Sequence, residues 1–185
     1  MAGVCSNNET WRMAVNVIAS DMTVSTRDDV QLAVRPVEAG DAQALVDFFR
    51  SVSADDRRFR FLSAQAHVGA SQIAPLIEVD HWQSENFLAF DTKTGALVAT
   101  AMLACDPRME LGEVAVSIRH DYKGRGVGWA MLDLLGKAAQ DRGLKQVIAI
   151  EDRENHAAIE LEREKGFTPR PFAGDPALVV LTKTF

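Results

Sequence analysis

The segment Lys123-Gly124-Arg125-Gly126-Val127-Gly128 decides the fold, because it joins a predicted strand to a predicted helix. Residues 111–119 before it predict a strand, and residues 127–142 repeat apolar side chains at helical spacing up to Gly143. The first N–H groups of a helix lack partners and the helix dipole is positive there, so such a loop suits a phosphate ligand. A plain glycine-rich turn is the alternative interpretation.

Two better-known phosphate loops do not match this segment. A P-loop needs four residues between its first glycine and a Gly-Lys-Ser/Thr run, and the chain has no such run. The dinucleotide fingerprint G-x-G-x-x-G would need a glycine where Trp129 stands, and it normally opens the first crossover of a parallel domain. Here the loop follows several predicted antiparallel strands, so both alternatives are disfavoured.

The residues after the loop predict a parallel crossover. Residues 144–150 form a nearly continuous apolar run, which is typical of a central strand covered on both faces. Strand, loop, helix and strand in this order make a crossover unit. Asn155 can then cap a helix over residues 156–165 that Gly166 ends, and residues 177–185 predict a last strand.

The residues before the loop predict an antiparallel meander. Residues 30–36, 86–90 and 96–103 have strand patterns, and the turn 91–95 joins the last two of them. Apolar spacing predicts helices over residues 41–53 and 55–62, with a short helical or turn segment over 75–80. We therefore expect an α/β (α+β) fold, in which a central mixed, mostly antiparallel sheet of six to seven strands is flanked by about four helices.

Composition indicates one soluble globular domain. The chain has 185 residues, 47% hydrophobic and 25% charged, which excludes a disordered chain or a disulfide-stapled miniprotein. Its net charge of -6 disfavours nucleic-acid binding. Neither a signal-peptide pattern nor a long apolar run is present, so we expect a cytoplasmic protein without a membrane partner. Residues 1–29 predict an irregular extension with one short element near 13–18, and residues 30–185 predict the domain.

At the glycine loop the chain resembles the GNAT superfamily of acetyl-CoA-dependent N-acetyltransferases. That family's loop is Gln/Arg-x-x-Gly-x-Gly/Ala, and residues 123–128 match it except for Lys123 at the first position. The resemblance continues through the helix that begins at Asn155 and the Gly166-Phe167 pair that follows it, and it covers residues 30–185. It implies the GNAT fold, acetyl-CoA as cosubstrate and direct acetyl transfer to a primary amine.

The resemblance also implies which residues bind the cosubstrate. These are Val116, Ile118, Lys123, Gly124, Arg125, Gly126, Val127, Gly128 and Asn155. Asn155 has a second interpretation as a helix cap alone. Many members carry a tyrosine general acid where this chain has Glu162, and the single tyrosine, Tyr122, does not map to that position. Whether the reaction uses a general acid is therefore open.

A closer resemblance is to the acetyltransferase domain of bacterial Pat-type protein lysine acetyltransferases. Residues 111–116 and 121–126 carry it, and residues 58–62 and 79–80 resemble that group more weakly. It implies that Glu113 is the general base. It also implies a protein lysine ε-amine as acceptor, with an acyl-CoA synthetase as an implied partner. Rival functions are acetylation of a small amine and a catalytically silent acyl-CoA sensor.

The chemistry gives Glu113 a reason to be catalytic. A lysine with a pKa of ~10.4 is neutral at pH 7 in roughly one molecule in 2,500, a penalty of about 4.6 kcal/mol that a nearby base relieves. We expect burial to raise the pKa of Glu113 towards neutrality. The alternatives are that Glu113 faces solvent or pairs with an arginine.

Other polar residues receive structural interpretations. His156 and Glu160 are one helical turn apart but lack a third ligand, so we expect no metal site. Cys105 is expected in the core. Three arginines, Arg57, Arg58 and Arg60, are expected on a solvated helix face. Four acidic residues are expected to border an acceptor cleft: Glu78, Asp80, Asp106 and Glu110.

Overall fold

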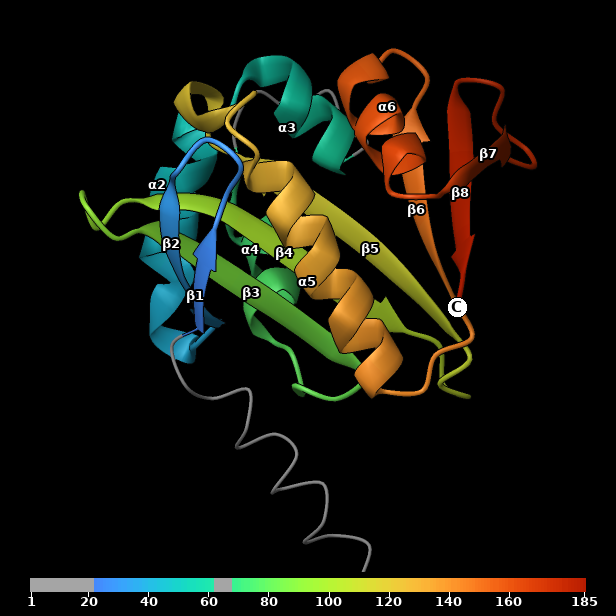
Figure 1. Ribbon diagram of the computed structural model, residues 1–185, viewed down its shortest axis with the longest axis horizontal. Helices are drawn as coiled ribbons and strands as arrows, with labels where there is room; N and C mark the ends of the chain where they lie inside the picture. The colour runs from blue at the N-terminus through green and yellow to red at the C-terminus, as the bar shows by residue number, and fades with distance from the viewer. Residues whose placement is uncertain (1–21, 62–67) are drawn as a thin grey trace, which may run out of the picture.

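The computed structural model describes residues 22–61 and 68–185, which form one sheet with helices on both faces (Figure 1). The strands are β1 (Met22–Ser25), β2 (Gln31–Pro36), β3 (Ser84–Asp91), β4 (Leu97–Cys105), β5 (Leu111–Ile118), β6 (Gln146–Asp152), β7 (Thr168–Pro171) and β8 (Leu178–Thr184). The helices are α2 (Ala42–Ser51), α3 (Ala54–Phe61), α4 (Ala70–Ile77), α5 (Val127–Asp141) and α6 (His156–Glu164), with short 3-10 turns η1 (Ala39–Asp41) and η2 (His120–Tyr122).

The strand order is β1-β2-β3-β4-β5-β6-β8-β7, and each neighbouring pair except β5–β6 is antiparallel. The β5–β6 pair is parallel because α5 carries the chain across the sheet between them, as the crossover pattern predicts. Parallel pairing therefore occurs at a single junction in the described sheet, directly after the glycine loop and its helix.

Two apolar cores cover the two faces of the sheet. In Figure 1, α5 crosses one face of β3–β5, while α2 and α4 lie behind it. The core under α5 includes Met131 and Leu135 of the helix, and the core under α2 and α4 includes Phe49 and Leu76. These four side chains are at most 2% exposed, so each face of β4 and β5 is fixed by its own helix layer.

The fold class is confirmed, but the structure adds strands that the sequence analysis missed. Within residues 22–61 and 68–185 the sheet has eight strands rather than six to seven, and five α-helices accompany it rather than about four. Strand β1 lies inside the predicted irregular extension, where four residues are too few for a clear alternation. Strand β7 has the sequence Thr-Pro-Arg-Pro and lies at the sheet edge, the place where a strand tolerates prolines.

Helix α4 also differs from its prediction over residues 75–80. It begins at Ala70 and contains Pro75, so the proline lies within a helix that it was expected to start. The short element predicted near residues 13–18 lies outside the described residues. No helix in the described ranges is long and apolar enough to cross a membrane.

Candidate active site

Strands β5 and β6 separate soon after they begin, and this separation creates the site. Their parallel register runs through Leu111↔Gln146 and Gly112↔Val147 and ends at Glu113↔Ile148. Arg119 N–H donates to Val98 of β4 and Leu111 C=O accepts from Asp106, so the odd residues of β5 direct their backbone groups to β4. The even residues therefore direct theirs towards β6, and those beyond the last pair, Val116 and Ile118, face the gap.

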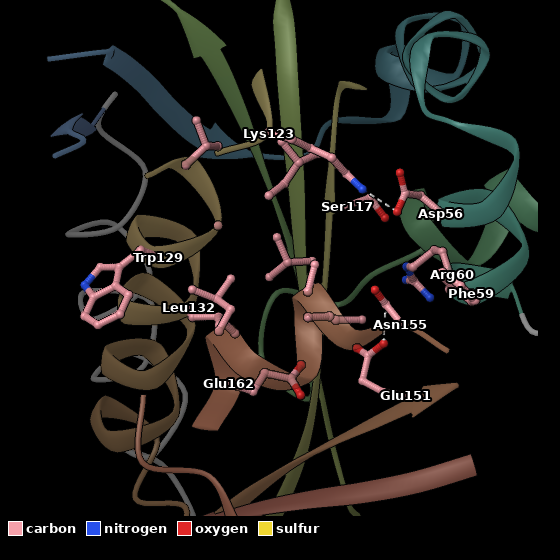
Figure 2. Close-up of a pocket in the computed structure, with 18 of the residues that line it drawn as sticks. Asp56, Phe59, Arg60, Ser117, Lys123, Trp129, Leu132, Glu151, Asn155 and Glu162 are labelled. Atoms are coloured by element: carbon pink, nitrogen blue, oxygen red, sulfur yellow. Dashed lines mark hydrogen bonds and ion pairs between the residues drawn. The ribbon is translucent and has the colours of Figure 1, made fainter. Parts of the chain in front are cut away.

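A cavity of about 540 Å³ fills this gap. Strand β5, the glycine loop, the first turn of α5, helix α6 and helix α3 all contribute to its wall (Figure 2). Its ionisable lining residues are Arg27, Asp28, Asp56, Arg60, Glu113, Lys123, Glu151 and Glu162. The cavity has two distinct ends, which we call the loop end (residues 123–128 and the first turn of α5) and the carboxyl end (Glu113, Glu151 and Glu162, with Arg60).

The loop end is built mainly from backbone. Gly124 and Gly126 have φ of 71° and 76°, a left-handed conformation that favours glycine, and Gly126 is the N-cap of α5. The first helical N–H bond is from Ala130 to Gly126 C=O, so the N–H groups of residues 127–129 have no partner within the helix. At Gly128 of α5, an added Cβ would lie 2.8 Å from Leu161 of α6 and 2.9 Å from Ile118 of β5. The first turn of α5 therefore packs closely against both of these elements.

Two contacts hold the loop end in place. The buried hydroxyl of Tyr122 donates a 2.7 Å hydrogen bond to Asp91, and this bond lowers the pKa of that carboxyl. Lys123 forms a 2.5 Å ion pair with Asp56 of α3 across the cavity mouth (Figure 2). Tyr122 is therefore a structural anchor in the η2 turn.

Glu113 stands at the point where the two strands separate. It shares a face of β5 with Ala115 and Ser117, and Met102, the β4 neighbour of Ala115, contacts Arg60 of α3. The side chain is exposed in the cavity rather than buried as the sequence analysis expected, because α3 covers this face of β5 incompletely. Glu113 is thus not the buried carboxyl of the cavity. A buried carboxyl lies instead on the opposite wall.

That opposite wall carries the half-buried Glu151 of β6 and the buried Glu162 of α6. Asn155 donates a 2.7 Å hydrogen bond to Glu151, and its side chain makes no hydrogen bond that caps α6. Burial, followed by the charge of Glu151 and a hydrogen bond between the two carboxyls, raises the pKa of Glu162 to about 9. Burial also raises the pKa of Glu151, against the lowering effect of Asn155 and Arg60.

Arg60 points into the site, contrary to the predicted solvated helix face. Its Nη2 lies 3.6 Å from the sulfur of Met102, and no carboxylate of the described residues lies within ion-pair distance. Burial lowers the pKa of the guanidinium, while the charges of Glu113 and Glu151 raise it. The neighbouring Arg57 and Arg58 behave differently, since Arg57 bonds backbone carbonyls and Arg58 pairs with Asp152 at 3.3 Å.

Most of the predicted site residues lie together. Glu113, Val116, Ile118, Lys123, Gly124, Gly126, Val127, Gly128 and Asn155 all line the cavity. Arg125 does not, because its guanidinium lies over the Tyr122 ring at 4.8 Å. The four acidic residues expected at the acceptor cleft also lie outside the lining. Asp106, for example, accepts hydrogen bonds from the backbone of Glu110 and Leu111.

Sequence reasoning missed several residues that line the cavity: Arg27, Asp28, Asp56, Phe59, Arg60, Trp129, Leu132, Glu151 and Leu161. One signal in the sequence could have placed Glu162 in the site. Asn155, Ala158 and Glu162 have helical spacing, which puts them on one side of α6. Within residues 22–61 and 68–185, no cluster of three or more metal-ligating side chains occurs.

Known proteins share this architecture. The chain is 26% identical to an acetyltransferase of Pseudomonas aeruginosa over 94% of its own length and 95% of that protein. The structure superposes on the GNAT domain of S. lividans PAT with a TM-score of 0.81 at 24% identity, covering 89% of this chain and 96% of that one. A GNAT-family acetyltransferase of Streptococcus pneumoniae gives a TM-score of 0.64 at 20% identity, covering 83% of this chain and 99% of that one. A family profile described as "Acetyltransferase (GNAT) family" matches residues 54–167, more than half of the chain. With its separated β5–β6 pair and its glycine loop, this chain belongs to the GNAT acetyltransferase family.

Proposed function

We propose that this GNAT acetyltransferase binds acetyl-CoA along the open edge of β5 and transfers the acetyl group to a protein lysine ε-amine, with Glu113 as general base. The observation that carries the proposal is the cavity where β5 and β6 separate, with phosphate-binding geometry at one end and Glu113 at the other. An acyl-CoA synthetase as the protein acceptor is supported only by the resemblance to Pat-type protein lysine acetyltransferases.

The cavity fits acetyl-CoA in two respects. The unpaired N–H groups at the start of α5, in a left-handed glycine loop, suit the pyrophosphate. The backbone N–H and C=O of Val116 and Ile118 face the gap, where the amide-containing pantetheine arm can complete the interrupted ladder. An N–H group of Val116 that points at the thioester oxygen would stabilise the negative charge that develops there.

Glu113 can accept the proton that the amine must lose. Its exposed carboxylate lies in the cavity wall at the last paired residue of β5, open to the incoming acceptor. A base within hydrogen-bond reach, directly or through one water, typically contributes 10²- to 10⁴-fold. The acidic lining of the carboxyl end also favours a cationic acceptor.

Arg60 supports a second candidate acceptor, a small amine that also carries a carboxylate. Its guanidinium lines the acceptor side of the cavity and has no carboxylate partner among the described residues. Such a group suits an anionic substituent of the acceptor, because guanidinium binds carboxylates in a bidentate geometry. Glutamate or aspartate next to a target lysine would supply the same anion in a protein.

The function is tested by incubating the protein with acetyl-CoA and two acceptor panels, folded lysine-bearing proteins and free amines with or without a carboxylate. Mass spectrometry should show enzyme-dependent lysine acetylation that saturates with acceptor. Saturable acetylation of a free amine without protein acetylation would favour the second candidate. Acetyl-CoA binding without transfer to either panel would identify a silent sensor.

The role of Glu113 is tested by Glu113→Gln, with Glu110→Gln outside the cavity as the matched control. Glu113→Gln should leave the acetyl-CoA affinity unchanged in calorimetry and lower turnover by about 10² to 10³-fold. The defect should shrink as pH rises, because the acceptor then deprotonates without help. Equal turnover of the variant and the parent at pH 7, with chemistry rate limiting, would remove Glu113 from the mechanism.

A further inference from the structure

Helix α3 forms one wall of the cavity and is held to the rest of the protein largely by polar contacts. Each of its eight residues keeps part of its surface exposed, whereas α2 and α4 bury apolar side chains in the core behind the sheet. Arg57 donates to two backbone carbonyls at the end of α2, and Arg58 pairs with Asp152 at 3.3 Å. Phe61 adds an apolar contact with Phe49. A helix with so little buried apolar surface can shift at small cost.

An ion pair links α3 to the glycine loop. Lys123 Nζ lies 2.5 Å from Asp56 Oδ1, and Figure 2 shows the two side chains meeting between α3 and the start of the loop. The Ser53 hydroxyl donates to the Asp56 carboxylate and accepts from the Asp56 N–H, so the start of α3 fixes this carboxylate. The side chain of Asp56 is 17% exposed and that of Lys123 is 42% exposed. Lys123 is therefore the partner that can turn away.

The proposed cosubstrate changes the balance of this ion pair. Lys123 and Gly124 line the loop end, where the N–H groups at the start of α5 suit a pyrophosphate. A pyrophosphate brings more negative charge to Lys123 than the carboxylate of Asp56 does, and it is repelled by that carboxylate. Arg125, the other cation of the loop, lies over the Tyr122 ring at 4.8 Å instead. Phosphate binding at the loop end therefore competes with Asp56 for the ammonium group of Lys123.

We propose that Asp56 is a positioning residue that links α3 to the glycine loop through Lys123 in the free protein, and that acetyl-CoA breaks this link because Lys123 turns to the pyrophosphate. This inference rests on the proposed binding of acetyl-CoA. Helix α3 also carries Phe59 and Arg60, which line the acceptor side of the cavity. Loss of the link frees this wall, so the acceptor side adjusts to its substrate once the cosubstrate is bound.

The competition fixes the sign of the effect that Asp56 has on acetyl-CoA binding. A ligand that must break an existing ion pair binds less tightly than it would without that pair. Removal of the Asp56 carboxylate removes both the competing partner of Lys123 and the repulsion of the pyrophosphate, so the affinity should rise. A carboxylate that held Lys123 in its phosphate-binding position would have the opposite effect, because its removal would lower the affinity.

The first test compares Asp56→Asn with Asp55→Asn, which makes the same change of charge at an exposed neighbour outside the cavity lining. Asp56→Asn should bind acetyl-CoA about 3- to 10-fold more tightly than the parent in calorimetry. Asp55→Asn should bind within about 2-fold of the parent, since it removes no partner of Lys123. An affinity of Asp56→Asn that is lower than that of the parent, or equal to it, would overturn the proposal.

Amide hydrogen exchange measures the link directly and without turnover. In the parent, acetyl-CoA should slow exchange at the loop end and speed it by about 3-fold or more in α3, because α3 loses its contact with Lys123. In Asp56→Asn, α3 should exchange at the faster rate with or without acetyl-CoA. Slower or unchanged exchange of α3 in the parent on addition of acetyl-CoA would overturn the proposal. Absence of acetyl-CoA binding by the parent would instead refute the proposed function on which the inference rests.

Discussion

The loop end and the carboxyl end of the cavity are built in opposite ways. The loop end uses the backbone of one continuous segment, residues 123–128, and the N–H groups at the start of α5. The carboxyl end uses side chains from four elements: Glu113 of β5, Glu151 of β6, Glu162 of α6 and Arg60 of α3. A backbone site is fixed by local sequence, whereas a side-chain site exists only once the sheet has formed.

This difference has an electrostatic consequence. At the loop end the polar groups are fixed dipoles that do not titrate, so its binding property changes little with pH. At the carboxyl end the buried Glu162 and the half-buried Glu151 compete for one proton, so the stability of the fold depends on pH. Substitutions at the carboxyl end should therefore have effects that depend on pH, whereas substitutions at the loop end should have effects that do not.

The largest expected effect is on the pH dependence of stability, and it belongs to the carboxyl end. The pKa of Glu162 is raised on folding, so the folded state holds a proton that the unfolded state has lost. Its favourable contribution is full below a pH of about 4 and is lost as pH rises towards 9. The unfolding free energy of Glu162→Gln should therefore rise relative to that of the parent by up to about 1.4 kcal/mol per pH unit between roughly pH 5 and 8.

Urea unfolding of parent and variant at several pH values measures this difference. The two proteins should have similar unfolding free energies near pH 4.5 and should diverge above it. Glu160→Gln, exposed on the same helix, should run parallel to the parent throughout. A constant difference between Glu162→Gln and the parent across the range would mean that Glu162 is ionised in the folded protein.

The next effect should come from packing at the loop end. A Cβ at Gly128 would meet Leu161 and Ile118 at distances that real Cβ atoms do not show, so Gly128→Val should lower the unfolding free energy by about 3 kcal/mol. The matched control is Gly136→Ala in the same helix, where an added Cβ meets nothing within 4 Å. The unfolding free energy of that variant should rise by about 0.5–1 kcal/mol, because alanine has a higher helix propensity than glycine. Equal thermal midpoints of the two variants would contradict this packing argument.

The sequence predicted the loop end well because its determinants are contiguous. The glycines of residues 123–128 indicated a loop between a strand and a helix, and the apolar repeat from Val127 indicated the helix that follows. The order of strand, loop, helix and strand then fixed the parallel junction β5–β6, where the cavity lies. Only the weak elements at the sheet edges, β1 and β7, escaped prediction among the described strands.

The carboxyl end could not be predicted in the same way, because its members lie far apart in the chain. Arg57 and Arg58, which precede Arg60, bind backbone carbonyls or pair at the surface. The sequence pattern of α3 therefore did not show that the side chain of Arg60 points into the cavity. Glu162 was recognised solely as a departure from the family tyrosine. Its burial depends on Glu151 of β6 lying beside it, a contact set by the tertiary fold. The same lack of tertiary information led to the wrong expectation that Glu113 is buried.

A smaller effect should separate charge from backbone strain at Gly124. This residue has φ of 71° and nothing within 4 Å of an added Cβ, and both asparagine and aspartate tolerate that conformation. Gly124→Asp should weaken acetyl-CoA binding by about 30-fold, equivalent to about 2 kcal/mol, because a carboxylate would face the pyrophosphate. Gly124→Asn, with equal strain and no charge, should bind within about 3-fold of the parent. Equal affinities of the two variants in calorimetry would show that no phosphate lies at Gly124.

The smallest effect should come from Tyr122→Phe, which removes the anchor of the loop end without touching the cavity. The variant loses the 2.7 Å bond to Asp91, a carboxyl that is 6% exposed and keeps hydrogen bonds from the N–H groups of Lys93 and Thr94. A hydrogen bond to a charged group contributes about 1.5 kcal/mol, so urea unfolding at pH 7 should show a loss of that size. The Tyr122 hydroxyl lowers the pKa of Asp91 in the folded state, so its contribution is present above a pH of about 4 and is lost as pH falls through the folded pKa. The stability difference should therefore shrink in acid, opposite in direction to the Glu162 effect, while kcat stays as in the parent. A loss of unfolding free energy that is constant down to pH 3 would show that Asp91 does not depend on Tyr122 for its charge.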